Sequence, residues 1–170
     1  VNRQVADGKR FPLLASLLAQ PVAGGTLLFV NTRAQVDQVA AELRKANQAC
    51  AIYRGEMDKV ERRANLQAFR DGETTLLIST DLASRGLDLE AVGRVINYHL
   101  PQQVENYLHR VGRTARAGRS GLVVNFVTER DRALIDQLAR HAPYDIASPR
   151  GSAPRRGFRG AAPGQRAPRT

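Results

Sequence analysis

The chain has 170 residues with 26 Lys or Arg against 16 Asp or Glu, so its formal net charge at pH 7 is +10. This balance points to an acidic partner, with nucleic acid first and an anionic membrane surface second. A single cysteine excludes an internal disulfide framework, and the lack of an apolar run of about 18 residues excludes a membrane-spanning sequence. We therefore expect a cytoplasmic protein that has no membrane partner.

Five short apolar runs along the chain predict β-strands. Most of them are apolar on both faces, which is typical of strands covered on both sides. The expected strands are Thr26–Val30, Cys50–Arg54, Thr75–Thr80, Arg94–Tyr98 and Gly121–Val127.

Helical patterns separate these runs. Between the first two strands, apolar residues recur at helical spacing from Arg33 to Ala46. The other expected helices are Phe11–Leu18, Val60–Arg70, Gln103–Gly112 and Glu129–His141. Strands that alternate with helices indicate an α/β fold, in which right-handed crossovers build an open parallel sheet with helices on both faces.

The composition changes near Pro143. From there to the end the chain is rich in Pro, Gly and Arg and contains one acidic residue, Asp145. Such a segment buries too little apolar surface to order itself, so we expect a folded domain over 1–142 and a disordered tail over 143–170. The tail segment RRGFRG (Arg155–Gly160) suits stacking on unpaired bases. The alternative is an inert solubilising tail.

The segment HRVGRTARAG (His109–Gly118) places arginines three residues apart. Treated as a continuation of the helix, it groups His109, Arg113 and Arg116 on one face, opposite Val104, Leu108 and Val111. Cations so spaced repel one another on an isolated helix. A row of them is explained by a bound polyanion, because Arg forms paired bonds with phosphate oxygens. The alternative is a solvated basic helix end.

Polar residues follow the expected strands at their carboxyl ends, where open parallel sheets bind ligands. Asn31 and Thr32 follow the first strand. Thr32 is a plausible helix cap, and the helix N–H groups behind it form an anion site, although a cap alone also explains both residues. After the second strand, Arg62 shares a helix face with Leu66 and Phe69, so it can reach over the edge of the sheet.

The third strand runs into TDLASRGLD. Thr80 and Asp81 end the apolar run abruptly, and Arg85 supplies a cation. Gly86 permits close approach of a backbone, and Asp88 is an acceptor of the kind that holds ribose hydroxyls. Each residue alone fits a turn or a cap, but together at one strand end they indicate a binding site.

The segments LLFVNTR, TDLASRGLD and HRVGRTARAG, in this order, resemble motifs IV, V and VI of the DEAD-box RNA helicases. The segment GEMDKVERRANLQAFRDG and the stretch from Pro101 to Tyr107 match that family as well. The resemblance extends to about residue 140 and implies a RecA-like C-terminal helicase domain. His109 at the start of the last motif favours the DEAD-box group over relatives that begin with Gln.

The resemblance also implies individual roles. Arg113 and Arg116 would be arginine fingers at the γ-phosphate of ATP, and Asp88 would hold the ATP ribose. His109 and Arg110 would form bonds across the cleft between two RecA-like domains. The residues that would grip the RNA backbone, with little sequence preference, are Asn31, Thr32, Arg62, Thr80, Arg85 and Gly86.

Four positions depart from the family pattern. Arg54 stands where the family usually has His, Lys59 where it has Gln, His99 where Asp is common, and Ala115 where Gly is usual. We expect Lys59 to add charge near the RNA. We expect the change at Ala115 to leave the finger arginines in place.

The sequence contains no GxxxxGK[ST] segment and no Asp-Glu-Ala-Asp segment. ATP and Mg²⁺ would then be held by an N-terminal RecA-like domain, and this chain alone is expected to lack ATPase activity. The main hypothesis is the second motor domain of an ATP-dependent RNA helicase that unwinds short duplexes. The alternatives are a stand-alone RNA-binding or regulatory module without motor activity, and a superfamily 2 translocase on DNA.

Overall fold

Within the described part of the chain, six β-strands form one sheet in the order β1-β6-β5-β2-β4-β3, and all neighbouring strands are parallel. This computed structural model describes residues 1–6, 8–84, 87, 89, 92–115 and 120–141, so the predicted tail lies outside the described residues. The strands are β1 (Asn2–Gln4), β2 (Thr26–Phe29), β3 (Ala51–Tyr53), β4 (Leu76–Ser79), β5 (Arg94–Asn97) and β6 (Leu122–Val127).

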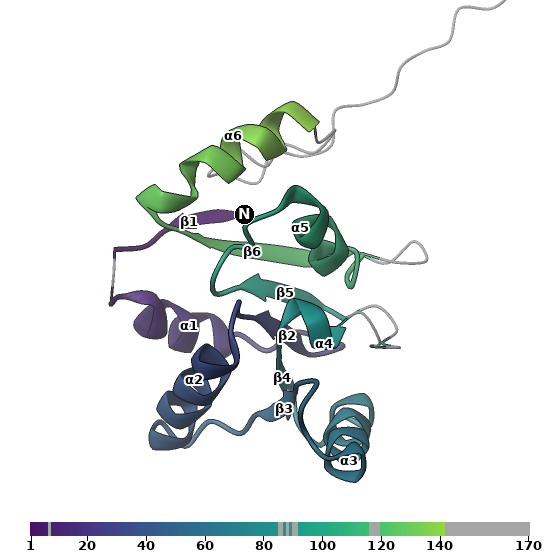
Figure 1. Cartoon of the computed structure of the whole chain (residues 1–170). Coiled ribbons are helices and arrows are strands. Elements are labelled where there is room, and N and C mark those ends of the chain that lie inside the picture. Colours follow the sequence, from purple (N-terminus) through teal and green to yellow (C-terminus); the bar gives the residue numbers. More distant parts are fainter. Residues whose placement is uncertain (7, 85–86, 88, 90–91, 116–119, 142–170) are drawn as a thin grey trace, which may run out of the picture.

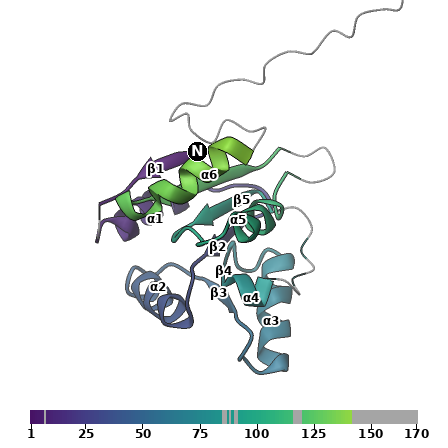
Figure 2. The same cartoon turned by 45° about the horizontal axis from the view of Figure 1, so that its top comes forward.

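Helices cover both faces of this sheet. Helices α1 and α2 lie on one face, and α3 and α4 lie on the other (Figures 1 and 2). The helices are α1 (Arg10–Leu18), α2 (Arg33–Lys45), α3 (Lys59–Arg70), α4 (Asp81–Ser84), α5 (Val104–Val111) and α6 (Arg132–His141), with a 3-10 turn, η1 (Glu129–Asp131), before α6. The predicted α/β fold, an open parallel sheet between two helical layers, is confirmed.

Apolar side chains from both faces of the sheet form the core, as expected for strands covered on both sides. The face toward α1 and α2 includes the fully buried Leu14, Leu28, Val36, Ile78 and Ile96. The opposite face includes Leu27, Phe29, Phe69, Leu77 and Ala83. A third cluster joins α5 and α6 through Leu100, Tyr107, Val127, Leu134 and Leu138.

Two elements escaped the sequence prediction. The strand β1 has three residues and pairs with β6 at the edge of the sheet. The helix α4 spans only Asp81–Ser84 and follows β4 directly. Both are too short to show a period in the sequence, and α4 lies where the sequence alone indicates a turn. Among the described residues no helix has the length and apolarity that crossing a bilayer requires.

Candidate functional site

Arg110 lies at the centre of the carboxyl edge of the sheet, and its side chain is fully buried. Its Nε and Nη2 atoms donate to the two carboxylate oxygens of Asp81 at 2.5 and 2.7 Å. Nη2 also donates to Asn31 Oδ1 at 2.8 Å. Nη1 donates to the His99 carbonyl at 2.7 Å and to Asn97 Oδ1 at 3.2 Å. All five N–H donors of the guanidinium therefore have acceptors.

These contacts join three neighbouring strands at the same level. Asn31, Asp81 and His99 each stand two positions beyond the last residue of β2, β4 and β5. The Arg110 guanidinium also stacks above the Phe29 ring, with Cζ 5.0 Å from the ring centroid. A buried cation is tolerated when it is paired and fully hydrogen-bonded, as this one is. Arg110 therefore fixes the relative positions of three loops that follow the strands.

All five bonds of the Arg110 guanidinium lie within this domain. The bonds across an interdomain cleft that the resemblance implies for Arg110 stay a prediction. The helix pattern was wrong in part. Helix α5 ends at Val111, so Arg113 follows the helix, and Leu108 is 48% exposed instead of buried. The period misled because α5 packs through Tyr107 and Arg110, one helical turn apart.

Asn31 and Thr32 immediately precede α2, and Thr32 caps its N-terminus. The Thr32 hydroxyl accepts a bond from the Gln35 amide, and the Gln35 side chain accepts bonds from the Thr32 and Asn31 amides, which makes a capping box. The Asn31 side chain donates to the Leu100 carbonyl and accepts from Arg110. The cap interpretation is confirmed for Thr32. The RNA contact implied for both residues stays a prediction.

Thr80 and Arg62 flank this network on the side of β4 and β3. Thr80 lies between β4 and α4 and is half-buried, and among the described residues no hydrogen-bond partner holds its hydroxyl. Arg62 donates to the Gly55 carbonyl at 3.0 Å and stands over the Tyr53 ring, with Cζ 5.8 Å from its centroid. Arg62 thus reaches back over the end of β3, as its position on α3 predicts.

His109 and Arg113 lie at the end of α5 and just beyond it. His109 is exposed in the last turn, and Arg113 is half-buried. The Arg113 carbonyl accepts from the Val92 amide, and the Thr114 hydroxyl donates to the Val92 carbonyl at 2.5 Å. A Cβ at Gly121 would lie 2.0 Å from that hydroxyl, so only glycine fits there. The backbone that carries Arg113 is thereby fixed, and its Nη1 donates to the Leu87 carbonyl at 2.8 Å.

The remaining predicted site residues lie outside the described residues. They are Arg85, Gly86, Asp88 and Arg116. Their predicted contacts with RNA and ATP stay predictions.

The departures from the family pattern have different consequences. Arg54 pairs with Asp37 at 2.6 Å and so joins the end of β3 to α2. Burial, reinforced by the nearby Arg10 and Arg110, lowers the pKa of His99 to about 4, so this side chain is neutral at neutral pH. Ala115 has φ +54°, a left-handed conformation that strains an alanine. The exchange of Gly for Ala at 115 is therefore costlier than its small volume suggests.

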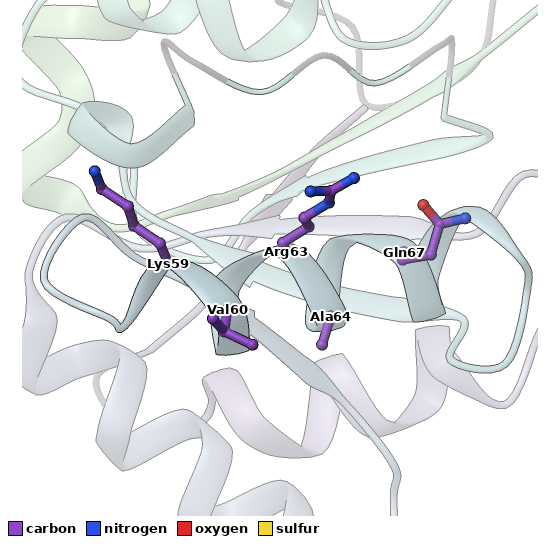
Figure 3. Close-up of a pocket in the computed structure, with 5 residues that line it drawn as sticks. All are labelled: Lys59, Val60, Arg63, Ala64 and Gln67. Carbon is purple, nitrogen blue, oxygen red and sulfur yellow. The ribbon is translucent and has the colours of Figure 1, made fainter.

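Helix α3 also carries an outward-facing groove of about 550 Å³ (Figure 3). It is lined by Lys59, Val60, Arg63, Ala64 and Gln67. Lys59 and Arg63 are exposed one helical turn apart and point to the same side of the helix. The two neighbouring arginines of α3 thus separate, because Arg62 turns to Tyr53 and Arg63 turns to the groove.

Sequence reasoning missed the polar partners that hold Arg110. In the sequence Asp81 marks only the end of an apolar run, and Asn97 lies within an expected apolar strand. The available signal was their type, since a polar residue at the end of a buried strand requires a partner. Which residue is that partner depends on the packing of α5 against the sheet.

Comparisons with known proteins agree with this geometry. Residues 9–118 match the family described as "Helicase conserved C-terminal domain". The chain is 41% identical over 116 residues to a probable eukaryotic initiation factor 4A of Trypanosoma brucei brucei, which covers 68% of this chain and 29% of that protein. It is 43% identical over 115 residues to eukaryotic initiation factor 4A-9 of Nicotiana tabacum, with 68% and 28% covered. The chain thus spans less than a third of the length of these two relatives.

Solved structures show the same similarity. The E. coli DEAD-box protein SrmB, solved bound to regulator of ribonuclease activity A, is 32% identical with a TM-score of 0.77, over 91% of this chain and 96% of that one. S. cerevisiae Dbp5, solved bound to RNA and ADP BeF3, is 27% identical with a TM-score of 0.75, over 82% of this chain and 37% of that one.

Proposed function

Because this chain belongs to the helicase conserved C-terminal domain family and is the C-terminal RecA-like domain of a DEAD-box RNA helicase, we propose that it is the second motor domain of an ATP-dependent helicase that unwinds short RNA duplexes. The carboxyl edge of its sheet binds the RNA backbone. The end of α5 meets ATP, which is held by an N-terminal RecA-like domain.

The observation that carries this proposal is the arrangement of polar groups at one sheet edge. Thr80 offers a hydroxyl between β4 and α4, and Arg62 offers a guanidinium beside the adjacent strand β3. Backbone phosphates accept bonds from such groups without regard to base sequence. Asn31 and Thr32 follow β2 at the same edge, and the proposal includes them in the contact with RNA together with Arg85 and Gly86, which the resemblance assigns to it.

The nucleotide side of the proposal rests on the turn after α5. Arg113 Nη1 donates to the Leu87 carbonyl, and Leu87 precedes Asp88 in the sequence, to which the resemblance assigns the ATP ribose. The residues fit a nucleotide in this respect. Bound ATP with Mg²⁺ supplies the phosphoryl group, and Arg113 and Arg116 stabilise the charge on it. His109, exposed at the end of α5, bonds to the partner domain in this proposal.

The test is RNA binding by the purified chain, measured by fluorescence anisotropy on a single-stranded oligonucleotide over a salt series. Arg62→Gln is expected to weaken binding about fivefold and to flatten the salt slope, because one phosphate contact is lost. Arg63→Gln is the matched control, since it removes the same charge from the other side of α3. Equal losses from both variants would mean that binding is diffuse attraction to a basic surface.

Two further measurements separate the alternatives. The purified chain is expected to hydrolyse no ATP, and turnover by it would contradict an ATP site shared between two domains. In the full-length protein, RNA is expected to stimulate ATP hydrolysis more than DNA of the same sequence. The reverse preference would favour a DNA translocase, and a full-length protein without ATPase activity would favour a stand-alone RNA-binding module.

A further inference from the structure

Three asparagines stand in register on the adjacent strands β5, β6 and β1. Asn97 pairs with Asn125, and Asn125 pairs with Asn2. Asn97 is fully buried and Asn125 is 1% exposed. Their side chains bond to one another: Asn97 Nδ2 donates to Asn125 Oδ1 at 2.8 Å, and Asn125 Nδ2 donates to Asn2 Oδ1 at 2.8 Å. We call these three residues the asparagine row.

The row begins at Arg110, and this fixes its direction. A guanidinium has donors and no acceptor, so Asn97 must turn its oxygen toward Arg110 Nη1. The NH₂ group of Asn97 then faces Asn125, which must present its own oxygen. The NH₂ group of Asn125 is left to donate to Asn2. Each amide orientation in the row is therefore determined by the cation at its end.

The row also contacts α5 a second time. Asn125 Nδ2 donates to the Tyr107 hydroxyl at 3.0 Å, and Tyr107 lies one helical turn before Arg110. Burial raises the pKa of that hydroxyl, so it stays protonated. Asn97 thus bonds to Arg110, and Asn125 bonds to Tyr107. Both of these side chains lie on the buried face of α5. Amides buried this deeply destabilise a sheet unless they are bonded, and apolar residues at these positions would avoid that requirement.

We propose that Asn97 and Asn125 are positioning residues: they set the place of the Arg110 guanidinium and, through its bonds, the relative placement of Asn31 and Asp81 at the carboxyl edge. Asp81 begins α4, and Asn31 precedes the cap of α2. The row therefore orders both loops before a ligand arrives, which lowers the entropy cost of binding. That this edge receives RNA rests on the proposed function, whereas the positioning itself does not.

The test compares two buried substitutions of similar size in the purified chain. Asn97→Leu removes one bond to Arg110. The control Thr26→Val, at the start of β2, removes one bond to Arg94, another buried arginine, at the start of β5. Side-chain ¹⁵N–¹H spectra follow the Arg110 Nε–H signal, and hydrogen exchange follows the Asn31 and Ser84 amides. Anisotropy gives the RNA affinity of each variant.

In Asn97→Leu we expect the Arg110 Nε–H signal to shift and its exchange with water to become about tenfold faster, with a similar effect at the Ser84 amide. RNA affinity falls about tenfold. Thr26→Val is expected to lower the melting temperature comparably and to leave these signals and the RNA affinity within about twofold of the parent chain. Exchange at Arg110 and Ser84 that stays at the parent rate in folded Asn97→Leu, or that accelerates equally in Thr26→Val, would overturn the proposal.

A conservative variant keeps the proposal falsifiable should Asn97→Leu not fold. Asn97→Asp retains an acceptor for Arg110 and replaces the donor toward Asn125 by a carboxylate oxygen, to which Asn125 can turn its NH₂ group, so exchange of Arg110 Nε–H is expected near the parent rate. Acceleration in this variant would contradict the positioning role. Absence of RNA binding by the parent chain would remove the proposed function alone, because the exchange rates still decide whether the row positions Arg110.

Discussion

Two arginines are buried against the same sheet, at opposite ends of its strands, and their surroundings differ in kind. Arg94, 2% exposed at the start of β5, donates to the carbonyls of Leu17 and Gln20 at the end of α1 and to the Thr26 hydroxyl. Burial lowers the pKa of Arg94. Arg110, at the other end, forms a two-point ion pair with Asp81 and bonds to two asparagine side chains.

The difference shows what each buried cation does. Arg94 donates to carbonyls at the C-terminal end of α1, where the regular helix bonds stop. All of its acceptors are neutral, and its role is to stabilise the fold. Arg110 joins groups that follow three strands, namely the Asn31 and Asp81 side chains and the His99 carbonyl. RNA contacts are proposed for Asn31 and for Thr80, which precedes Asp81. A buried cation at the amino edge thus stabilises the fold, whereas one at the carboxyl edge also arranges a binding surface.

The largest expected effect comes from Arg110→Met. It leaves the Asp81 carboxylate, which is 25% exposed, without its cation, and we expect the free energy of unfolding to fall by about 3 kcal/mol. RNA affinity is expected to fall as well, since Asn31 and Asp81 lose their common partner. Urea unfolding and anisotropy measure the two effects.

The double variant Arg110→Met/Asp81→Leu is the control for this prediction. It removes the unpaired carboxylate, so part of the stability is expected to return while RNA affinity stays low. If the stability losses of the two single variants simply add in the double variant, the ion pair contributes nothing beyond its separate groups.

Arg94→Met tests the other side of the comparison. No acidic partner is left behind among the described residues, only neutral acceptors, so we expect a loss of about 2 kcal/mol in the free energy of unfolding. The RNA affinity of the folded fraction should stay unchanged. A drop in affinity as large as that of Arg110→Met would mean that both ends of the sheet serve the binding surface.

The contrast between the two arginines also marks what the sequence could reveal. The five strands other than β1 and the helices that alternate with them follow from apolar periodicity, because each must bury a face against its neighbours. Polar residues after strands pointed to the carboxyl edge before any contact was known. Arg94 stands alone before an apolar strand and Arg110 stands in a row of arginines, however, and nothing local distinguishes these buried cations from exposed ones.

The roles inside the edge depend on three-dimensional register. Asn97 and Asn125 are 28 positions apart and meet only because β5 and β6 pair in parallel at that level. The resemblance implies an RNA contact for Asn31, and in the structure its side chain accepts a bond from Arg110, which lies 79 positions away. No periodic pattern in the sequence marks either of these contacts. Resemblance to a family identified the segments correctly, but only the packing shows which side chains are occupied within the domain.

A pH series sharpens the comparison, because His99 lies beside Arg110 and has a pKa of about 4 against an ordinary value of 6.5. Below pH 6.5 the imidazole of His99 is protonated in the unfolded chain, whereas in the folded chain it stays neutral down to about pH 4. The folded state therefore loses stability as the pH falls toward 4. Partial exposure of the ring limits the loss to about 1 kcal/mol. Urea unfolding at pH 7 and pH 4.5 measures it.

His99→Gln isolates the contribution of this group from those of the carboxylates. The variant is expected to lose less stability between the two pH values than the parent chain does. Asp131, which faces His99 and favours its charged form, opposes Arg10 and Arg110 in this balance. If the parent chain and His99→Gln lose the same free energy of unfolding between the two pH values, groups other than His99 cause the pH dependence.

The smallest expected effect concerns the turn that follows Arg110. Ala115 has φ +54°, so Ala115→Gly relieves backbone strain, and glycine's greater freedom in the unfolded chain offsets part of the gain. We expect a net gain of about 0.5 kcal/mol, seen as a melting temperature higher by about 2 °C. Asn47 has the same φ and is the matched control, because asparagine tolerates this conformation and Asn47→Gly should change little. If the two glycine variants gain equally, Ala115 is no more strained than Asn47, and alanine at this turn carries no special cost.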